Sequence, residues 1–194
     1  MSQGECVIKI HKPDVEEKLF FFLCGAITSV PLTIFVAQFA DSFLTGLAPF
    51  YAILISTAVF APFIEEFAKA FPLFYRHGET ERSIFSLALF VGLGFGVVEM
   101  LTYIFLIGAN PIARLPGLFF HPASTAIVAY GIATKRPLPF YLLAVIFHFS
   151  NNFLAVMALA LTNPFVSYFS GIIVAITVFT SWRLYGRTRE RFIE

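Results

Sequence analysis

The sequence predicts an all-α protein, a polytopic membrane bundle of about six transmembrane helices with both termini in the cytoplasm. Three observations predict this fold. First, 58% of the 194 residues are hydrophobic and only 13% are charged, which lies far outside the balance of soluble domains. Second, apolar segments recur at close to the length of about 20 residues that crosses a bilayer as a helix. Third, the lysine and arginine residues gather on one side of those segments.

The predicted spans follow one another along the chain, and one of them is broken by Pro and Gly residues. The first is expected to be retained rather than cleaved as a signal sequence. Acidic residues are mixed with the lysines that precede it, and no A-x-A-like cleavage site follows. The spans are 18–40, 48–75, 83–107, 113–134, 138–161 and 165–186.

The distribution of basic residues sets the expected orientation. Arg114 lies alone on one side, Lys69 lies within a span, and the other basic residues lie on the opposite side, which is therefore predicted to be cytoplasmic. The Arg-rich tail suits an anchor at the anionic inner leaflet, and the net charge of +1 gives no indication of a nucleic acid partner. The cytoplasmic set is Lys9, Lys12, Lys18, Arg76, Arg82, Lys135, Arg136, Arg183, Arg187, Arg189 and Arg191.

The chain is expected to form a single integral membrane domain, 1–194. Residues 1–17 would be a cytoplasmic N-terminal segment and residues 187–194 a basic cytoplasmic tail. No repeat, linker or low-complexity run marks a second domain, so any activity has to be built inside the bundle. Gly92 and Gly96 have the small-xxx-small spacing that permits close helix packing.

Ionisable side chains within the predicted spans are the main functional signal. A charge at the bilayer centre costs from about 2.5 to well over 10 kcal/mol, so such groups need partners. When depth is counted from the predicted cytoplasmic end of each helix, polar side chains from four helices lie at a similar depth, roughly 15 to 24 Å. The polar residues are Glu65, Glu66, Lys69, Glu99, His121, His148, Asn151 and Asn152.

Helical spacing predicts which of these side chains face one another. His148 shares a face with Asn151 and Asn152, one turn further along. Adjacent glutamates diverge by about 100° around a helix, so one of Glu65 and Glu66 is expected to face the site while the other pairs with Lys69 or supports a ligand from behind. The alternative for Lys69 is that it snorkels to a membrane surface. For a single Glu or His, the alternative is a structural hydrogen bond.

The charge of this layer suits a metal ion. Three carboxylates and one ammonium group sum to about −2, which one divalent cation or the protonation of two carboxylates would neutralise. Two His nitrogens with a carboxylate and an open position are a ligand set by which zinc activates water. Another carboxylate can accept the proton of the water, and Asn152 can stabilise an oxyanion. The chain has no HExxH, so the site must be assembled between helices.

Four motifs in order resemble those of PrsW-type intramembrane proteases, a group related to CAAX prenyl proteases and bacteriocin-processing enzymes. The resemblance covers Pro62 to Asn152. The motifs are P-x-x-E-E-x-x-K (Pro62, Glu65, Glu66, Lys69), G-x-G-F-x-x-x-E (Gly92, Gly94, Phe95, Glu99), R-x(6)-H (Arg114, His121) and H-x-x-x-N (His148, Asn152).

The resemblance implies hydrolysis of a peptide bond in a membrane-anchored protein, with an anti-sigma factor as the substrate of the best-known case. It implies a multi-pass location in the cell membrane, which we expect to be a prokaryotic inner or plasma membrane. By position, Glu65 and Glu66 match the paired glutamates and Asn152 the final polar residue. Glu99, His121 and His148 match the second-motif acid and the two histidines.

In our leading hypothesis, these three residues bind the metal. Glu65, or else Glu66, acts as the general base, and Asn152 donates a hydrogen bond to the oxyanion. We expect zinc, although another divalent metal stays open.

Two residues depart from the family pattern. Met100 follows Glu99 where many PrsW-type sequences have Asn, which would remove a supporting contact. Pro122 directly follows His121, and we expect it to unwind the helix there.

Two other function classes stay open at this point. A proton-coupled carrier would use the same buried ionisable residues, with helices broken at prolines, but no convincing repeat relates 18–107 to 113–186. A membrane scaffold would use Glu and His only for helix association. Within the enzyme class, a CAAX-type or bacteriocin-processing protease is the alternative, disfavoured because the second motif ends in Glu99 rather than His. The sequence does not indicate an oligomeric state.

Overall fold

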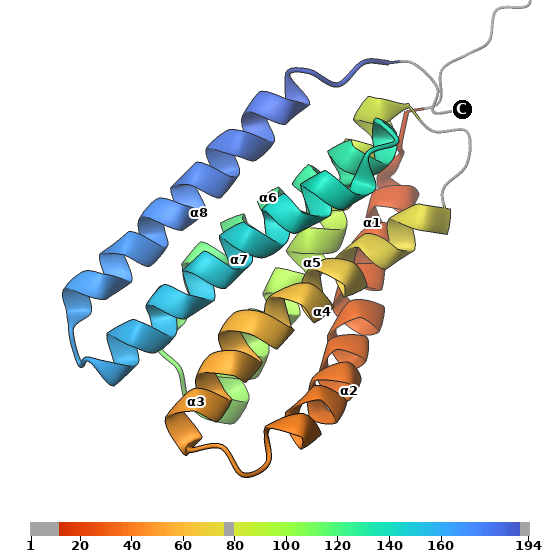
Figure 1. Ribbon diagram of the computed structural model, residues 1–194. Coiled ribbons are helices and arrows are strands. Elements are labelled where there is room, and N and C mark those ends of the chain that lie inside the picture. The colour runs from red at the N-terminus through yellow and green to blue at the C-terminus, as the bar shows by residue number, and fades with distance from the viewer. Residues whose placement is uncertain (1–11, 76–79, 191–194) are drawn as a thin grey trace, which may run out of the picture.

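The computed structural model describes residues 12–75 and 80–190, which form a bundle of long apolar helices without a strand in those ranges (Figure 1). Within these two ranges, six helical segments are long and apolar enough to cross a membrane, which confirms the predicted fold class. Residues 1–11 and 191–194 of the two predicted terminal segments lie outside the described residues, and the first helix already begins at Val15.

The first two spans are composite. The first contains α1 (Val15–Leu23), a π-helical stretch η1 (Cys24–Ser29), α2 (Val30–Asp41) and a short turn η2 (Ser42–Leu44). The second contains α3 (Pro49–Leu54), a π-helical stretch η3 (Ile55–Phe60), α4 (Ala61–Ala70) and η4 (Phe71–Tyr75). The other four spans are single helices: α5 (Glu81–Ile107), α6 (Pro111–Ala133), α7 (Pro137–Ala160) and α8 (Pro164–Tyr185).

Local sequence signals explain where these helices begin and end. Asp14 caps α1 and forms a reciprocal capping box with Glu17. The side chains of Asn110 and Asn163 cap α6 and α8, and each is followed by a proline at the first helical position. Gly108 ends α5 in the left-handed conformation, with φ of 71°.

The two ends of the described chain meet at one end of the bundle (Figure 1). The Arg82 guanidinium donates to the Thr188 carbonyl over 3.1 Å, and the Arg189 amide donates to Glu81 over 2.9 Å. The loop from α7 to α8 lies at the opposite end. The arrangement therefore places both described ends on the same side of the bundle, and the cytoplasmic assignment of that side stays a prediction.

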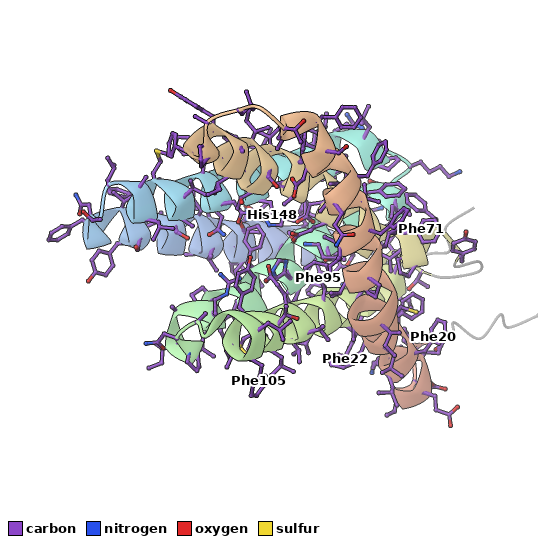
Figure 2. The ribbon with its side chains drawn as sticks, turned by 90° about the horizontal axis from the view of Figure 1, so that it is seen from below. Phe20, Phe22, Phe71, Phe95, Phe105 and His148 are labelled. Atoms are coloured by element: carbon purple, nitrogen blue, oxygen red, sulfur yellow. The ribbon has the colours of Figure 1, made fainter. Side chains whose placement is uncertain are left out.

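Glycines let α5 pack closely on two neighbours. A Cβ at Gly94 would overlap the Phe22 carbonyl of α1, and one at Gly92 would overlap the His121 carbonyl and the Pro122 Cα of α6. The close approach predicted for Gly92 is thus confirmed. Figure 2 shows His148 and Phe95 directed into the bundle, where both are buried, whereas Phe20 and Phe105 lie on its outside.

The prolines affect the helices differently from the prediction. Pro122 does not unwind α6, because the helix continues from Pro111 to Ala133. Neighbouring helices and hydroxyl groups can stabilise a proline turn inside a bundle. Here Gly92 leaves room for this turn, and the Thr125 hydroxyl donates to the His121 carbonyl over 2.8 Å. The irregularity occurs instead before Pro62, where η3 is π-helical.

Candidate active site

Glu66 and Lys69 form a buried ion pair at the centre of the bundle. Both side chains are fully buried, and Lys69 Nζ donates to Glu66 Oε1 over 2.7 Å. They are three residues apart on α4, so they share one face of that helix. Ser124 of α6 donates to the same Glu66 oxygen over 3.2 Å and accepts from Lys69 Nζ over 3.2 Å. The snorkelling alternative for Lys69 is therefore wrong, because its charge is satisfied within the protein.

His148 of α7 is held by the same carboxylate. Its Nδ1 lies 2.8 Å from Glu66 Oε1, so with an ionised carboxylate Nδ1 carries the hydrogen and Nε2 keeps its lone pair. That Nε2 lies 3.6 Å from Glu65 Oε2. A carboxylate that accepts from one ring nitrogen and leaves the other available is the usual support of a metal-binding histidine. Glu66 thus pairs with Lys69 and His148 while Glu65 faces the site. Helical spacing predicts that the two glutamates diverge in this way, but not which of them faces the site.

Glu99 of α5 joins two residues of α6. Its Oε2 lies 2.8 Å from His121 Nε2 and 3.4 Å from Arg114 Nη2. The other ring nitrogen of His121, Nδ1, lies 3.1 Å from Lys69 Nζ. The ammonium group donates to Nδ1, so Nε2 carries the hydrogen and donates to Glu99. The charge count made from the sequence includes the ammonium group of Lys69 but not Arg114. The three carboxylates therefore face two cations rather than one.

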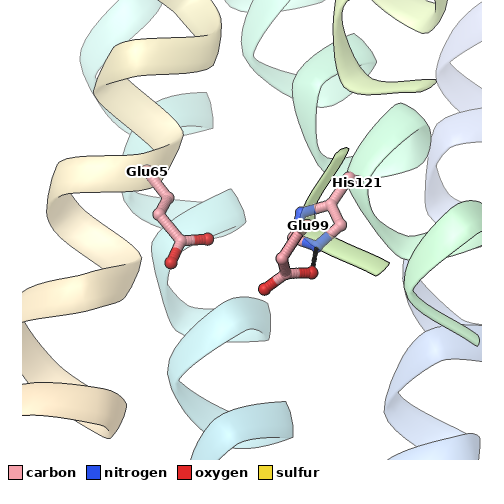
Figure 3. Close-up of side chains that lie close together, drawn as sticks. All are labelled: Glu65, Glu99 and His121. Carbon is pink, nitrogen blue, oxygen red and sulfur yellow. Dashed lines mark hydrogen bonds and ion pairs between the residues drawn. The ribbon is translucent and has the colours of Figure 1, made fainter. Parts of the chain in front are cut away.

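Glu65, Glu99 and His121 converge from three helices. Figure 3 shows the two carboxylates directed toward one another, with His121 bonded to Glu99. One ligand atom from each of the three residues lies within 4.8 Å of the other two. This separation is close enough for the three groups to surround one ion after small side-chain movements. The convergence is between α4, α5 and α6, and His148 approaches from α7 on the side of Glu65.

The donor set fits a divalent metal. Among the described residues, the buried oxygens Glu65 Oε2 and Glu66 Oε2 have no hydrogen-bond partner, which is costly unless a further group engages them. His148 offers a lone pair directly. His121 offers Nε2 in the tautomer that carries the ring hydrogen on Nδ1, which requires Lys69 Nζ to turn away from Nδ1. Carboxylate oxygens and imidazole nitrogens are the ligands that zinc accepts.

A cavity of about 600 Å³ adjoins these residues. Its wall includes Glu99, Arg114, His121 and His148 on one side and runs along α7 and α8 to Asn163 in the loop that joins them. The cavity therefore extends from the buried polar cluster toward the end of the bundle opposite the described chain ends. A volume of this size is typical of ligand pockets, so a segment of polypeptide can reach the cluster.

The two asparagines of α7 also line the cavity. Asn152 Nδ2 donates to the Thr57 carbonyl in the π-helical stretch over 3.0 Å. Asn151 donates to Asn152 Oδ1 over 3.3 Å and accepts from Ser170 of α8 over 2.6 Å. One Asn152 amide hydrogen thus positions the side chain against the second span, and the other stays available to a bound group.

Comparison with known protein families identifies the family of this chain. The searches of curated proteins and of solved structures returned no match. A family model described as PrsW family intramembrane metalloprotease matches residues 16–181. This match includes every motif from Pro62 to Asn152. The chain therefore belongs to the PrsW family of intramembrane metalloproteases, and it is a membrane-embedded protease.

Proposed function

We propose that this protein is an endopeptidase that cuts a membrane-anchored protein at the cluster formed by Glu65, Glu99, His121 and His148. The observation that carries the proposal is Glu65 Oε2, which has no hydrogen-bond partner among the described residues. Glu65 lies in one group with Glu99 and His121, and these two residues line a cavity large enough for a peptide. A carboxylate with a free oxygen in that position suits a general base. The family membership favours this reading over a carrier or a scaffold.

Glu99, His121 and His148 would hold the metal, and zinc suits the donor types best. A divalent cation bound there supplies a Lewis acid that polarises a carbonyl group and acidifies a water molecule. Glu66 holds the His148 ring through Nδ1, over 2.8 Å, and thereby fixes which nitrogen faces the site. Lys69 holds Glu66 in place through their ion pair.

Glu65 would move the proton. Its carboxylate takes a proton from water as the water oxygen adds to the carbonyl carbon of the peptide bond, and the carbonyl oxygen gains the negative charge. When the C–N bond breaks, the amine leaves with that proton from Glu65. The second amide hydrogen of Asn152 would donate to the charged oxygen. The products are a carboxylic acid, which then ionises, and an amine.

The substrate we propose is a protein with a membrane anchor. The first candidate is an anti-sigma factor in a prokaryotic cell membrane, because that is the substrate of the best-known PrsW-type case. The position of the cavity supports an anchored substrate, because the cavity opens along two apolar helices and ends at their connecting loop. A CAAX-type or bacteriocin-processing substrate is the alternative within the same chemistry.

A pool of anchored reporters tests the proposal across many candidate cleavage sequences at once. Each reporter carries one Leu/Ala helix of about 20 residues followed by a randomised stretch of about eight residues, roughly 26 Å when extended. Mass spectrometry of the pool after incubation with purified protein reads the cut sites. Wild type should cut a subset, and Glu65→Gln should cut at least about 100-fold more slowly while it keeps its metal.

Two variants separate base from ligand. Elemental analysis should show about one metal per chain in wild type and in Glu65→Gln, and much less in Glu99→Gln. Loss of metal from Glu65→Gln would make Glu65 a ligand instead of the base. An intact, metal-loaded wild type that cuts no reporter would defeat the endopeptidase proposal.

A further inference from the structure

Arg114 occupies the same face of α6 as His121. The two residues are seven apart, which is about two helical turns, and both line the cavity. Gly117 lies between them, and a Cβ at that position would lie 3.8 Å from Glu99 Oε2 and from His121 Nε2. Because Gly117 has no side chain, the space between the guanidinium group and the imidazole stays open to the cavity.

The guanidinium group of Arg114 is fixed in place. Its Cζ lies 3.7 Å from the centroid of the Tyr103 ring, which is the stacked arrangement that arginine favours over lysine. Tyr103 is on α5, one turn after Glu99, so α5 supplies both the stacking ring and the carboxylate. A cation held in this way is preorganised and needs little rearrangement to meet a developing negative charge.

The contact with Glu99 does not saturate Arg114. The Nη2 to Oε2 distance is 3.4 Å, whereas a charge-assisted hydrogen bond is about 2.7 to 2.9 Å long. Arg114 Nε is buried and has no partner among the described residues, so the group does not form the paired fork of a bidentate ion pair. The side chain is 30% exposed and lines the cavity, so it can donate a hydrogen bond to another oxygen.

Asn152 is a weaker candidate for the same task. It is neutral, and its Nδ2 already donates to the Thr57 carbonyl on the opposite wall. Arg114 carries a full charge and five N–H donors. Glu99 Oε2 also accepts a hydrogen bond from His121 over 2.8 Å, so Glu99 does not fully neutralise the Arg114 charge.

We propose that Arg114 is a catalytic residue that binds the carbonyl oxygen of the peptide bond being cut. This inference rests on the proposed endopeptidase function and assigns the main oxyanion donor of the site. As the water oxygen bonds to the carbonyl carbon, the electron pair of the C=O bond moves to the oxygen that faces Arg114, and the proton of the water goes to Glu65. The pair returns when the C–N bond breaks, and the amine leaves with that proton.

A purely supporting role makes a different prediction. If Arg114 only neutralises Glu99, its loss acts through the metal ligands and changes metal binding. If Arg114 contacts the substrate, its loss lowers kcat while metal content stays constant. Replacement by alanine also leaves space beside Gly117 that a free guanidinium ion can enter from the cavity.

The experiment compares wild type, Arg114→Ala and Arg114→Lys on the fastest-cut member of the reporter pool. Arg114→Ala should lose about 100-fold in kcat, the usual effect of removing one oxyanion donor, with an unchanged metal content by elemental analysis. Millimolar guanidinium chloride should restore at least about tenfold of that loss. Arg114→Lys should keep part of the activity. Arg136→Ala, an exposed arginine at the other end of α6 and α7, is the matched control and should behave as wild type.

Each outcome decides one claim. Loss of metal from Arg114→Ala, or recovery of its activity with excess metal, would assign Arg114 to the support of Glu99 and overturn the inference. Normal cutting by Arg114→Ala would overturn it as well, while the endopeptidase proposal stands. Guanidinium should not rescue Glu65→Gln, and rescue of both variants would show a nonspecific effect and overturn the assignment of Arg114. A wild type that cuts no reporter would remove the proposed function and the inference together.

Discussion

His148 Nδ1 lies 2.8 Å from Glu66 Oε1, the same oxygen that receives Lys69 Nζ over 2.7 Å. One fully buried carboxylate oxygen thus holds an imidazole of α7 and an ammonium group of its own helix. This sharing makes Glu66 an orienting residue, and it leaves Glu65, the neighbouring glutamate, to face the cluster.

Replacement of Glu66 should weaken metal binding without removing a proposed ligand. Glu66→Gln changes the group that accepts from His148 Nδ1, and loss of such an orienting carboxylate typically costs about 10- to 100-fold in metal affinity. Competition with a fluorescent chelator measures this change. Glu16→Gln, at an exposed position in α1, should leave the affinity unchanged, and an unchanged affinity in Glu66→Gln would contradict the orienting role.

Removal of His148 should abolish stoichiometric metal binding. His148 is 2% exposed, and its Nε2 is directed toward Glu65, so His148→Ala removes a proposed metal ligand. Elemental analysis of purified protein should then find well under one metal per chain, whereas Phe149→Ala should match wild type because Phe149 lies partly exposed on the next position of α7. Full metal content in His148→Ala would exclude His148 from the ligand set.

Removal of the Lys69 charge should destabilise the whole bundle. Lys69→Met keeps most of the side-chain volume but leaves Glu66 buried without its cation, and breaking a buried ion pair in this way costs about 3 to 5 kcal/mol. Unfolding in mixed detergent micelles measures the free energy. The exposed Lys135 provides the control, since Lys135→Met should change stability by about 0.5 kcal/mol or less. An equally small effect at Lys69 would show that the pair is dispensable.

A methyl group added at Gly92 should change the stability of the protein differently from one added at Gly171. Gly92→Ala places a Cβ against the backbone of α6 at His121 and Pro122, and overpacking of this kind costs about 1 to 3 kcal/mol or more. Gly171→Ala in α8 meets no atom within 4 Å, so it should be neutral or stabilise the helix by up to about 1 kcal/mol. The same unfolding assay compares the two, and equal stability would argue against the tight contact between α5 and α6.

Much of the fold is predictable because membrane spans are set by length and composition. The convergence of Glu65, Glu99, His121 and His148 is also predictable in outline, because buried charges in a bilayer must find one another. The angle between adjacent residues on a helix also predicts that Glu65 and Glu66 point in different directions, but not which of them faces the cluster.

The remaining contacts depend on helix rotation and side-chain reach, which spacing alone does not give. The sequence places Arg114 at the far membrane surface, but its long side chain reaches Glu99 from the first turns of α6. Ser124 is absent from the predicted cluster although it shares the His121 face, three residues on, a spacing that could have identified it. Unwinding of α6 at Pro122 is the wrong expectation, because α6 continues through Pro122 and Gly92 of the neighbouring helix leaves room for this turn.

The shared Glu66 oxygen has a consequence for how the protein is made. Its partners come from α4, α6 and α7, so a ribosome that has delivered only the first four spans has not yet supplied His148. Until the fifth span enters the bilayer, the nascent chain has one histidine of its pair and no complete cluster. If His148 is a metal ligand, as proposed, the site can assemble only after the fifth span has joined the other four.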